Sequence, residues 1–153
     1  MMNAFEFEHL FTYSATLKEA EIMGEVPEGF RINYWVTGGE VQGPKLNGNV
    51  LPVGADWLTI RRDGMAALDV RLSIHTEDGG LIDVTYPGLG DLGPNGYEAI
   101  VRGESPARMT LRTSPRFRTA HPDYQWLHRH LCVGIGEVDF ERAEVVYDVY
   151  ALR

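Results

Sequence analysis

The side chains best suited to proton transfer are Asp56, Arg71 and Tyr86, and two turn signals predict that they meet. Asp63-Gly64 and Asp78-Gly79 each separate two runs of alternating apolar residues. Asp-Gly in this setting is a strong hairpin signal, because the turn requires positive φ. If each turn has two residues, Arg71 pairs with Asp56 on one side and with Tyr86 on the other. The sequence therefore predicts a three-stranded meander with a carboxylate, a guanidinium and a phenol in one row.

Directly paired residues share one face of a sheet, so this register gathers the polar side chains of the meander on one side. The opposite face carries Trp57 and the apolar side chains from Leu68 to Ile74. A slip of one residue at either turn would flip a strand. The polar face comprises Asp56, Asp69, Arg71, Ser73, His75 and Tyr86.

Two interpretations of this polar face stay open. If it lines a lumen, burial shifts the pKa values of its side chains as general acid–base catalysis requires. The pairing of Asp56 with Arg71 would then offset the cost of burying either charge. If the face from Leu68 to Ile74 is the core instead, the same pair is an exposed ion pair contributing under about 1 kcal/mol.

The rest of the chain is predicted to consist mainly of short strands. In the first strand His9, Phe11 and Tyr13 have the same parity, so we expect them on one face. Residues 18–25 are a connection or a short strand, and residues 95–102 and 122–130 are short helices. Many short strands without βαβ alternation favour a mostly-β fold, an antiparallel sandwich or a barrel, and a barrel removes exposed edges. The main predicted strands cover residues 5–13, 30–36, 56–62, 65–76, 80–86, 109–113, 131–135 and 144–152.

Length and charge limit the class of protein. The 153 residues suit a single domain over positions 1–153. A formal net charge of −8 argues against nucleic acid as the main partner, because phosphate binding needs clustered Lys and Arg. The first residues lack a signal-peptide pattern, and no apolar run is long enough to span a membrane. We therefore expect a cytoplasmic protein.

Metal and cofactor sites are not expected. The single cysteine, Cys132, excludes a multi-cysteine metal site, and its apolar neighbours suggest a small buried hydrophobe. His128 and His130 are two residues apart on a predicted helix, so they point in different directions. The glycine-rich segment 88–93 lacks the lysine of a phosphate-binding loop.

A series of motifs runs over nearly the whole chain. In order they are Thr37-Gly38-Gly39 with Gly43-Pro44, Gly54-Ala55-Asp56-Trp57, Asp69-Val70-Arg71 with Thr76-Glu77-Asp78-Gly79, Pro115-Arg116-Phe117, and Tyr124-Gln125-Trp126-Leu127. In these motifs and their order the chain resembles the DUF3237 family, also called UPF0311. The resemblance implies a small antiparallel β-barrel of roughly lipocalin-like shape and no established general activity. It adds weight to Asp56, Trp57, Asp69, Arg71 and Asp78 as motif positions.

One position departs from the family pattern. After Trp126-Leu127 the family often has Asn, whereas this chain has His128. If that position reaches the pocket, His128 adds a proton-transfer group and alters the ligand.

The leading functional hypothesis is an enzyme acting on a small aromatic or polyketide-like oxygenated molecule, without a metal or nucleotide. An elimination, hydration, isomerisation or cyclisation suits such a set of side chains, because each needs placed proton transfers and an oxyanion partner. In this hypothesis Asp56 is the general base, and Arg71 holds it and balances its charge. His75 or His128 is the acid, and Tyr86 or Tyr124 polarises a carbonyl oxygen.

Two other hypotheses belong to different classes. The barrel could be a binding module that holds a small hydrophobic ligand unchanged, or a β domain that forms a homo-oligomer through its aromatic faces. Aromatic side chains are core by default, although some suit a pocket for a planar ligand. The predicted ligand-binding residues are Tyr34, Trp57, Asp69, Ser73, Tyr124 and Trp126.

Overall fold

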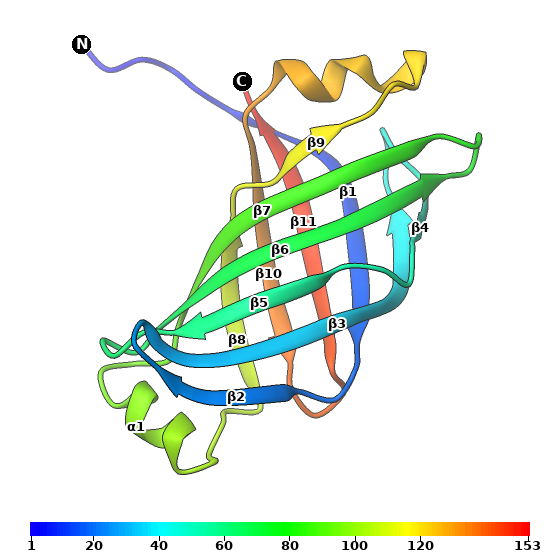
Figure 1. Cartoon of the computed structure of the whole chain (residues 1–153). Coiled ribbons are helices and arrows are strands. Elements are labelled where there is room, and N and C mark those ends of the chain that lie inside the picture. Colours follow the sequence, from blue (N-terminus) through cyan, green and yellow to red (C-terminus); the bar gives the residue numbers. More distant parts are fainter.

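The alternating segments form strands that curl into a closed antiparallel barrel (Figure 1). The structure is a computed structural model that describes all 153 residues. Eight strands close the barrel and two helices accompany it, which confirms the predicted fold class. The elements are β1 (Phe7–Leu17), β2 (Glu21–Val26), β3 (Gly29–Gln42), β4 (Gly48–Val50), β5 (Ala55–Ile60), β6 (Met65–Thr76), β7 (Leu81–Asp91), α1 (Gly96–Val101), β8 (Arg108–Thr113), β9 (Arg116–Arg118), the 3₁₀ helix η1 (Pro122–Arg129), β10 (Cys132–Asp139) and β11 (Glu144–Leu152).

Neighbouring strands pair around the barrel in the order β1, β3, β5, β6, β7, β8, β10 and β11, and β11 pairs with β1 to close it. Three short strands extend this wall: β2 pairs with β3, β4 bridges β3 and β6, and β9 pairs with β7. Closure leaves the main strands without free edges, which is the physical advantage expected of a barrel. None of the helices is long and apolar enough to cross a membrane.

The β5–β6 hairpin has a three-residue loop, not the two-residue turn predicted from Asp63-Gly64. Arg61 donates its backbone N–H to the Met65 carbonyl at 2.8 Å, and Gly64 donates to the Arg61 carbonyl at 3.0 Å. Residues 62–64 therefore form the loop, with Gly64 at φ +89° in the position that a three-residue hairpin reserves for glycine. The predicted register is wrong by one residue, because Asp56 pairs with Val70 and not with Arg71.

The β6–β7 hairpin shows the same departure. Thr76 donates its N–H to the Gly80 carbonyl at 2.9 Å, and Gly79, at φ +88°, donates to Thr76 at 3.0 Å. Tyr86 consequently pairs with Val70. The two slips cancel between the outer strands of the meander, so Asp56 and Tyr86 share a face as predicted, with Val70 between them in place of Arg71.

A β-bulge corrects the parity predicted for the first strand. The pairing of β1 with β11 shifts between His9 and Phe11, and both Leu10 and Phe11 are fully buried. The extra residue turns His9 toward the outer face, while Phe11 and Tyr13 stay inside. The aromatic face predicted for this strand is thus divided between the two sides of the barrel wall.

The two helices lie at opposite ends of the barrel, α1 beside β2 and η1 near both termini (Figure 1). Beneath η1 the interior is filled by buried apolar side chains, among them Phe11, Phe117 and Leu127. The Phe11 and Phe117 rings meet edge to face at 5.7 Å between centroids. Side-chain packing therefore fills the interior at the η1 end.

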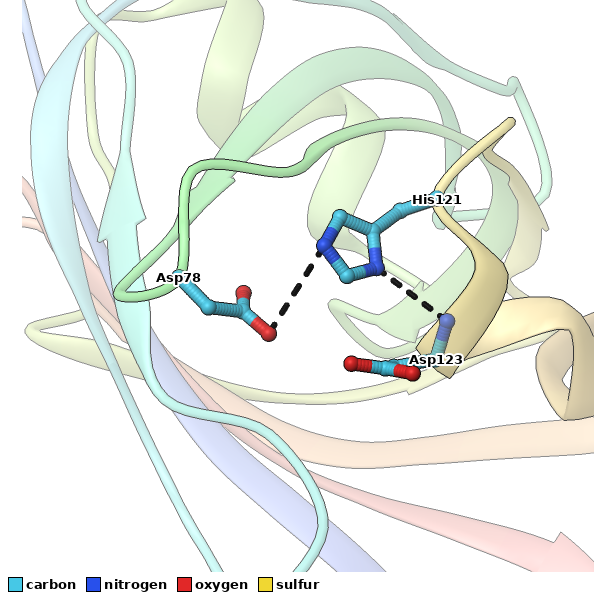
Figure 2. Close-up of side chains that lie close together, drawn as sticks. All are labelled: Asp78, His121 and Asp123. Atoms are coloured by element: carbon cyan, nitrogen blue, oxygen red, sulfur yellow. Dashed lines mark hydrogen bonds and ion pairs between the residues drawn. The ribbon is translucent and has the colours of Figure 1, made fainter.

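A polar cluster fastens the start of η1 to the β6–β7 loop (Figure 2). Tyr124 donates its hydroxyl to the Asp78 carboxylate at 3.0 Å, and His121 Nε2 lies 3.7 Å from the same carboxylate. His121 also caps the helix, because its Nδ1 accepts the Asp123 backbone N–H at 3.2 Å. The hydrogen bond from Thr76 is the largest of the effects that lower the pKa of Asp78, so this anchor carries a full negative charge at neutral pH.

Candidate active site in the barrel lumen

The interior of the barrel contains an apolar cavity of about 60 Å³ on the α1 side of its centre. Sixteen of its seventeen lining residues are hydrophobic, and the remaining one is Asp56. The apolar lining comes from the inward-facing residues of β6, such as Leu68, Val70 and Leu72, and from β8, β10 and β11. The lumen therefore presents one carboxylate among aliphatic and aromatic side chains.

Asp56 takes its position from a local opening in the β5–β6 ladder. The ladder pairs Asp56 with Val70 and Thr59 with Ala67, and the residues between them on β5 make no ladder pair. The Asp56 carboxylate fills this opening by accepting the Asp69 backbone N–H at 3.0 Å. From β3, on the other side of β5, Arg31 donates to the Trp57 carbonyl at 3.1 Å. The backbone thus fixes the carboxylate without using a side-chain cation as partner.

Burial raises the pKa of Asp56 from 3.8 to about 7. The carboxylate is half-buried, since it faces the cavity while protein surrounds it on the other sides. Loss of hydration disfavours the charged form. The hydrogen bond from the Asp69 backbone N–H lowers the pKa of Asp56, and the charge of the Asp69 carboxylate raises it. The charge of Arg31 lowers it. A carboxyl group with this pKa exchanges its proton near neutral pH, as a general base or acid requires.

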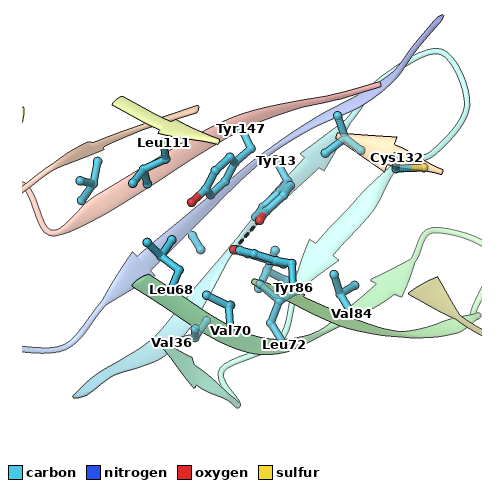
Figure 3. Close-up of a cluster of buried hydrophobic side chains, with 14 of the residues drawn as sticks. Tyr13, Val36, Leu68, Val70, Leu72, Val84, Tyr86, Leu111, Cys132 and Tyr147 are labelled. Atoms are coloured by element: carbon cyan, nitrogen blue, oxygen red, sulfur yellow. Dashed lines mark hydrogen bonds between the residues drawn. The ribbon is translucent and has the colours of Figure 1, made fainter. Parts of the chain in front are cut away.

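Three buried tyrosines, Tyr13 on β1, Tyr86 on β7 and Tyr147 on β11, meet in the interior of the barrel (Figure 3). Tyr13 donates its hydroxyl to that of Tyr86 at 2.6 Å, and the Tyr13 and Tyr147 rings stack at 5.2 Å between centroids. Burial raises the pKa of each phenol well above its ordinary value, and the Asp56 charge adds to the rise. The phenols therefore stay protonated and act as hydrogen-bond donors.

Asp56 and Tyr86 flank Val70 from the two neighbouring strands and both face the lumen. Strands in a sheet lie about 4.8 Å apart, so their backbones are roughly 10 Å apart across the wall. Tyr34 continues the row on β3, where it pairs with Asp56. Its pKa is raised, mainly by burial. This row places a proton acceptor between two phenols, with space for a small substrate group above Val70.

A second cavity of about 400 Å³ adjoins the lumen at the α1 end and forms a vestibule. Tyr34, Leu58, Met109 and Phe140 line both cavities and so form the neck between them. The vestibule is framed by β2, β3 and α1, and twelve of its fifteen lining residues are hydrophobic. Tyr97 holds α1 in place, because its hydroxyl donates to Glu25 on β2 at 2.8 Å.

Four of the predicted site residues lie on the outer face of the meander. The Arg71, Asp69 and His75 side chains are exposed, and Trp57 is half-buried beneath Arg71, whose guanidinium lies 5.8 Å from the indole ring centre. The predicted pairing of Asp56 with Arg71, whether in a lumen or on the surface, is therefore wrong. The prediction fails because the loop between β5 and β6 has three residues, which turns every odd-numbered residue of β6 outward.

The other predicted residues border a groove of about 990 Å³ formed by β7, β9 and η1, or lie on η1 near it. Ser73 and His128 line this groove, and His128 Nε2 accepts the Thr119 backbone N–H at 3.0 Å, so His128 does not reach the lumen. Tyr124 bonds Asp78, and the Trp126 indole donates to the Asp123 carbonyl at 3.1 Å. Of the eleven predicted residues, only Asp56, Tyr86 and Tyr34 line the lumen.

The cluster that anchors η1 is also the one able to hold a metal ion. Asp78, His121 and Asp123 each offer a ligand atom, and these atoms lie within 4.8 Å of one another. Asp78 already accepts hydrogen bonds from Thr76 and Tyr124, and His121 Nδ1 is used by the helix cap. The contacts within the cluster account for its geometry as a structural anchor.

Sequence reasoning missed Tyr13 and Tyr147 as members of the site. Both belong to aromatic strands that the sequence indicates, but only barrel closure brings β1 and β11 opposite β7. The alternating aromatics of β1 were the available signal, and the bulge at His9 hid which of them faces inward. Cys132, expected to be buried, is buried, and burial raises its thiol pKa to about 11.

Fold and site together define a class: a small closed antiparallel β-barrel with an apolar lumen, a single lumen carboxylate and one closed end. The chain belongs to the DUF3237 family of proteins of unknown function, whose model matches residues 5–152. The resemblance noted from the sequence motifs is thereby confirmed.

Relatives and solved structures agree with this assignment. A UPF0311 protein of Rhodopseudomonas palustris is 36% identical over 153 residues, with 98% of each chain covered. Its crystal structure, described as a conserved protein of unknown function, superposes with a TM-score of 0.87 over 99% of this chain and 100% of that one. A β-barrel-like protein of Acinetobacter baumannii is 27% identical with a TM-score of 0.83, covering 100% and 99%. A protein of Penicillium herquei described as an enzyme shares the fold at 20% identity and a TM-score of 0.71, covering 100% and 98%.

Proposed function

We propose that this protein is a small-molecule enzyme that performs general acid–base chemistry in its lumen on an aromatic or polyketide-like oxygenated substrate. The observation that carries the proposal is Asp56, the one charged residue of an otherwise apolar lumen, with a pKa raised to about 7. Perturbed carboxyl groups in enclosed pockets are candidates for catalytic bases. The fungal fold relative described as an enzyme is compatible with this proposal.

In the proposed mechanism the Asp56 carboxylate removes a proton from the carbon next to a substrate carbonyl, or from a substrate hydroxyl. In the first case the C–H electron pair moves to the carbonyl and forms an enolate, whose oxygen accepts a hydrogen bond from Tyr86. Tyr13 supports that donor through its 2.6 Å hydrogen bond. Return of the proton from Asp56 to another carbon completes an isomerisation, and loss of a leaving group with that proton completes an elimination. The same steps run in reverse for hydration. In the second case the deprotonated hydroxyl adds to the β-carbon of an unsaturated carbonyl in the same molecule, the C=C electron pair moves to form an enolate, and Asp56 returns its proton to the α-carbon, which completes a cyclisation.

The test is a screen of aromatic and unsaturated carbonyl compounds in D₂O, with mass spectrometry of each compound that raises the melting temperature. We expect the wild type to convert a stabilising compound or to exchange its acidic C–H for deuterium, and Asp56→Asn to bind it without either change. Asp83→Asn is the matched control, because Asp83 is an exposed acid on the outer face of β7. If Asp56→Asn still converts the compound, Asp56 is not the general base.

The second candidate function is a binding module for a hydrophobic ligand, and the almost wholly apolar lining of the lumen favours it. In that case stabilising compounds remain chemically intact with the wild type, and Asp56→Asn changes only the affinity. Deuterium incorporation separates the two functions, since a passive carrier has no reason to accelerate proton exchange.

A further inference from the structure

The charge of the cavity walls restricts what can enter. Lumen and vestibule together contain two charged lining residues, Asp56 and Glu104, and both are acids. The Arg102 guanidinium lies 3.2 Å from the Glu104 carboxylate, but Arg102 does not line the vestibule. No cationic side chain lines either cavity. A carboxylate, sulfate or phosphate on a ligand would therefore lose its hydration without gaining a counter-ion, and it would be repelled by ionised Asp56.

The sizes of the two cavities restrict the shape of the ligand. One water molecule needs about 10–15 Å³ of cavity volume. The lumen cavity, at about 60 Å³, therefore holds only a compact group. The vestibule, at about 400 Å³, is several times larger and almost entirely apolar. A molecule that fills both therefore has a small head at Asp56 and a larger hydrophobic body beyond the neck.

We propose that the substrate is an uncharged, elongated molecule that enters at the α1 end, with a compact oxygenated head in the lumen and an apolar body in the vestibule. Met109 and Phe140, which line both cavities, set the width of the neck and so determine specificity. This inference rests on the proposed function for the identity of the ligand as a substrate. Which ligands bind can be measured without turnover.

The test uses two fluorescent probes that share one skeleton. N-phenyl-1-naphthylamine is neutral, and 8-anilino-1-naphthalenesulfonate carries an added sulfonate. We expect the neutral probe to bind the wild type at least tenfold more tightly than the sulfonate. Because the neutral probe is also more hydrophobic, Ser105→Lys adds a cation at the vestibule and should narrow this preference at least fivefold. Ser114→Lys places the same cation in the outer groove and should leave the preference unchanged.

A second pair of variants tests the entrance. Met109→Trp should weaken binding of the neutral probe at least tenfold by blocking the neck, whereas Leu131→Trp, a similar enlargement of a groove residue that is 71% exposed, should not. If Met109→Trp fails to fold, as judged by circular dichroism, Phe140→Trp, at another residue of the neck, replaces it.

Equal affinity for the two probes, loss of binding through Leu131→Trp but not the neck variants, or no binding of the neutral probe would overturn the inference. The result for the ligand class can be distinguished from the result for the proposed general base. If Asp56→Asn retains turnover while the probe pattern holds, the general base is wrong and the ligand class stands. If Asp56→Asn abolishes turnover while the sulfonate binds equally well, the ligand class is wrong and the base stands.

Discussion

Asp56 occupies a position that favours its protonated form. Its pKa of about 7, against an ordinary value of 3.8, means that the folded protein holds this proton where the unfolded chain has released it. The stabilisation from the retained proton is complete below about pH 4 and is lost as the pH rises through 7. A residue placed at such a cost to stability is more easily explained by chemistry than by folding.

Asp56→Asn should therefore become progressively more stable than the wild type as the pH rises. Asn keeps the oxygen that accepts the Asp69 N–H but carries no charge. We expect the difference in unfolding free energy to shift in favour of the variant by roughly 1–3 kcal/mol between pH 4.5 and 7.5. One pKa unit is worth about 1.4 kcal/mol, and the cavity-facing carboxylate keeps some hydration. Urea unfolding at the two pH values measures this, and a difference that does not change with pH would contradict the raised pKa.

Tyr13 should influence catalysis although it does not line the cavity. Its hydroxyl donates to Tyr86, which leaves the Tyr86 proton free for a substrate oxygen. We expect Tyr13→Phe to lower kcat about tenfold on a compound found by the D₂O screen, and Tyr86→Phe to lower it roughly a hundredfold or more. Tyr150→Phe, on the outer face of β11, should have no effect on kcat. Equal kcat for Tyr13→Phe and wild type would show that the phenol pair does not support the reaction.

At the level of the elements, the two hairpin loops share a backbone conformation but differ in their surroundings. Gly64 and Gly79 both have φ near +90°, yet a Cβ at Gly64 would lie 1.9 Å from the Gly93 carbonyl oxygen, while one at Gly79 would meet nothing within 4 Å. Gly79→Ala should cost about 1 kcal/mol from left-handed strain alone. Gly64→Ala should cost at least twice as much, because the α1-side loop must also move. Urea unfolding of the pair checks this, and equal costs would place the loop contact in doubt.

The same loops decided how much of the site could be predicted. Asp-Gly correctly indicated two hairpins, but the dipeptide fits both a two-residue turn and the end of a three-residue loop. The sequence alone does not distinguish them, so the register was wrong by one at each turn. The errors cancelled for Asp56 and Tyr86 because these residues lie on the two strands that flank β6. They did not cancel for Arg71 and His75, which lie on β6 itself.

For the whole molecule, the predicted barrel was correct because alternating strands without βαβ units leave few other ways to avoid free edges. What the sequence could not supply was closure: which strands face each other across the lumen, and which end is filled. Tyr13 and Tyr147 join the site only through the pairing of β1 with β11, and the far end is filled by side chains beneath η1, which Tyr124 fastens to Asp78. The two ends differ, because side chains fill the interior at the η1 end, whereas an apolar vestibule adjoins the lumen at the α1 end.

Closure of the barrel around Asp56 gives the central claim its most direct test, because an enclosed lumen is what raises this pKa. The measurement is a ¹³C NMR titration of the side-chain carboxyl groups in the wild type and in Asp56→Asn, which needs no substrate. We predict one aspartate carboxyl signal that titrates near pH 7 in the wild type and is missing from the variant. An Asp56 carboxyl that titrates near pH 4 would show a hydrated side chain and would contradict an enclosed catalytic base.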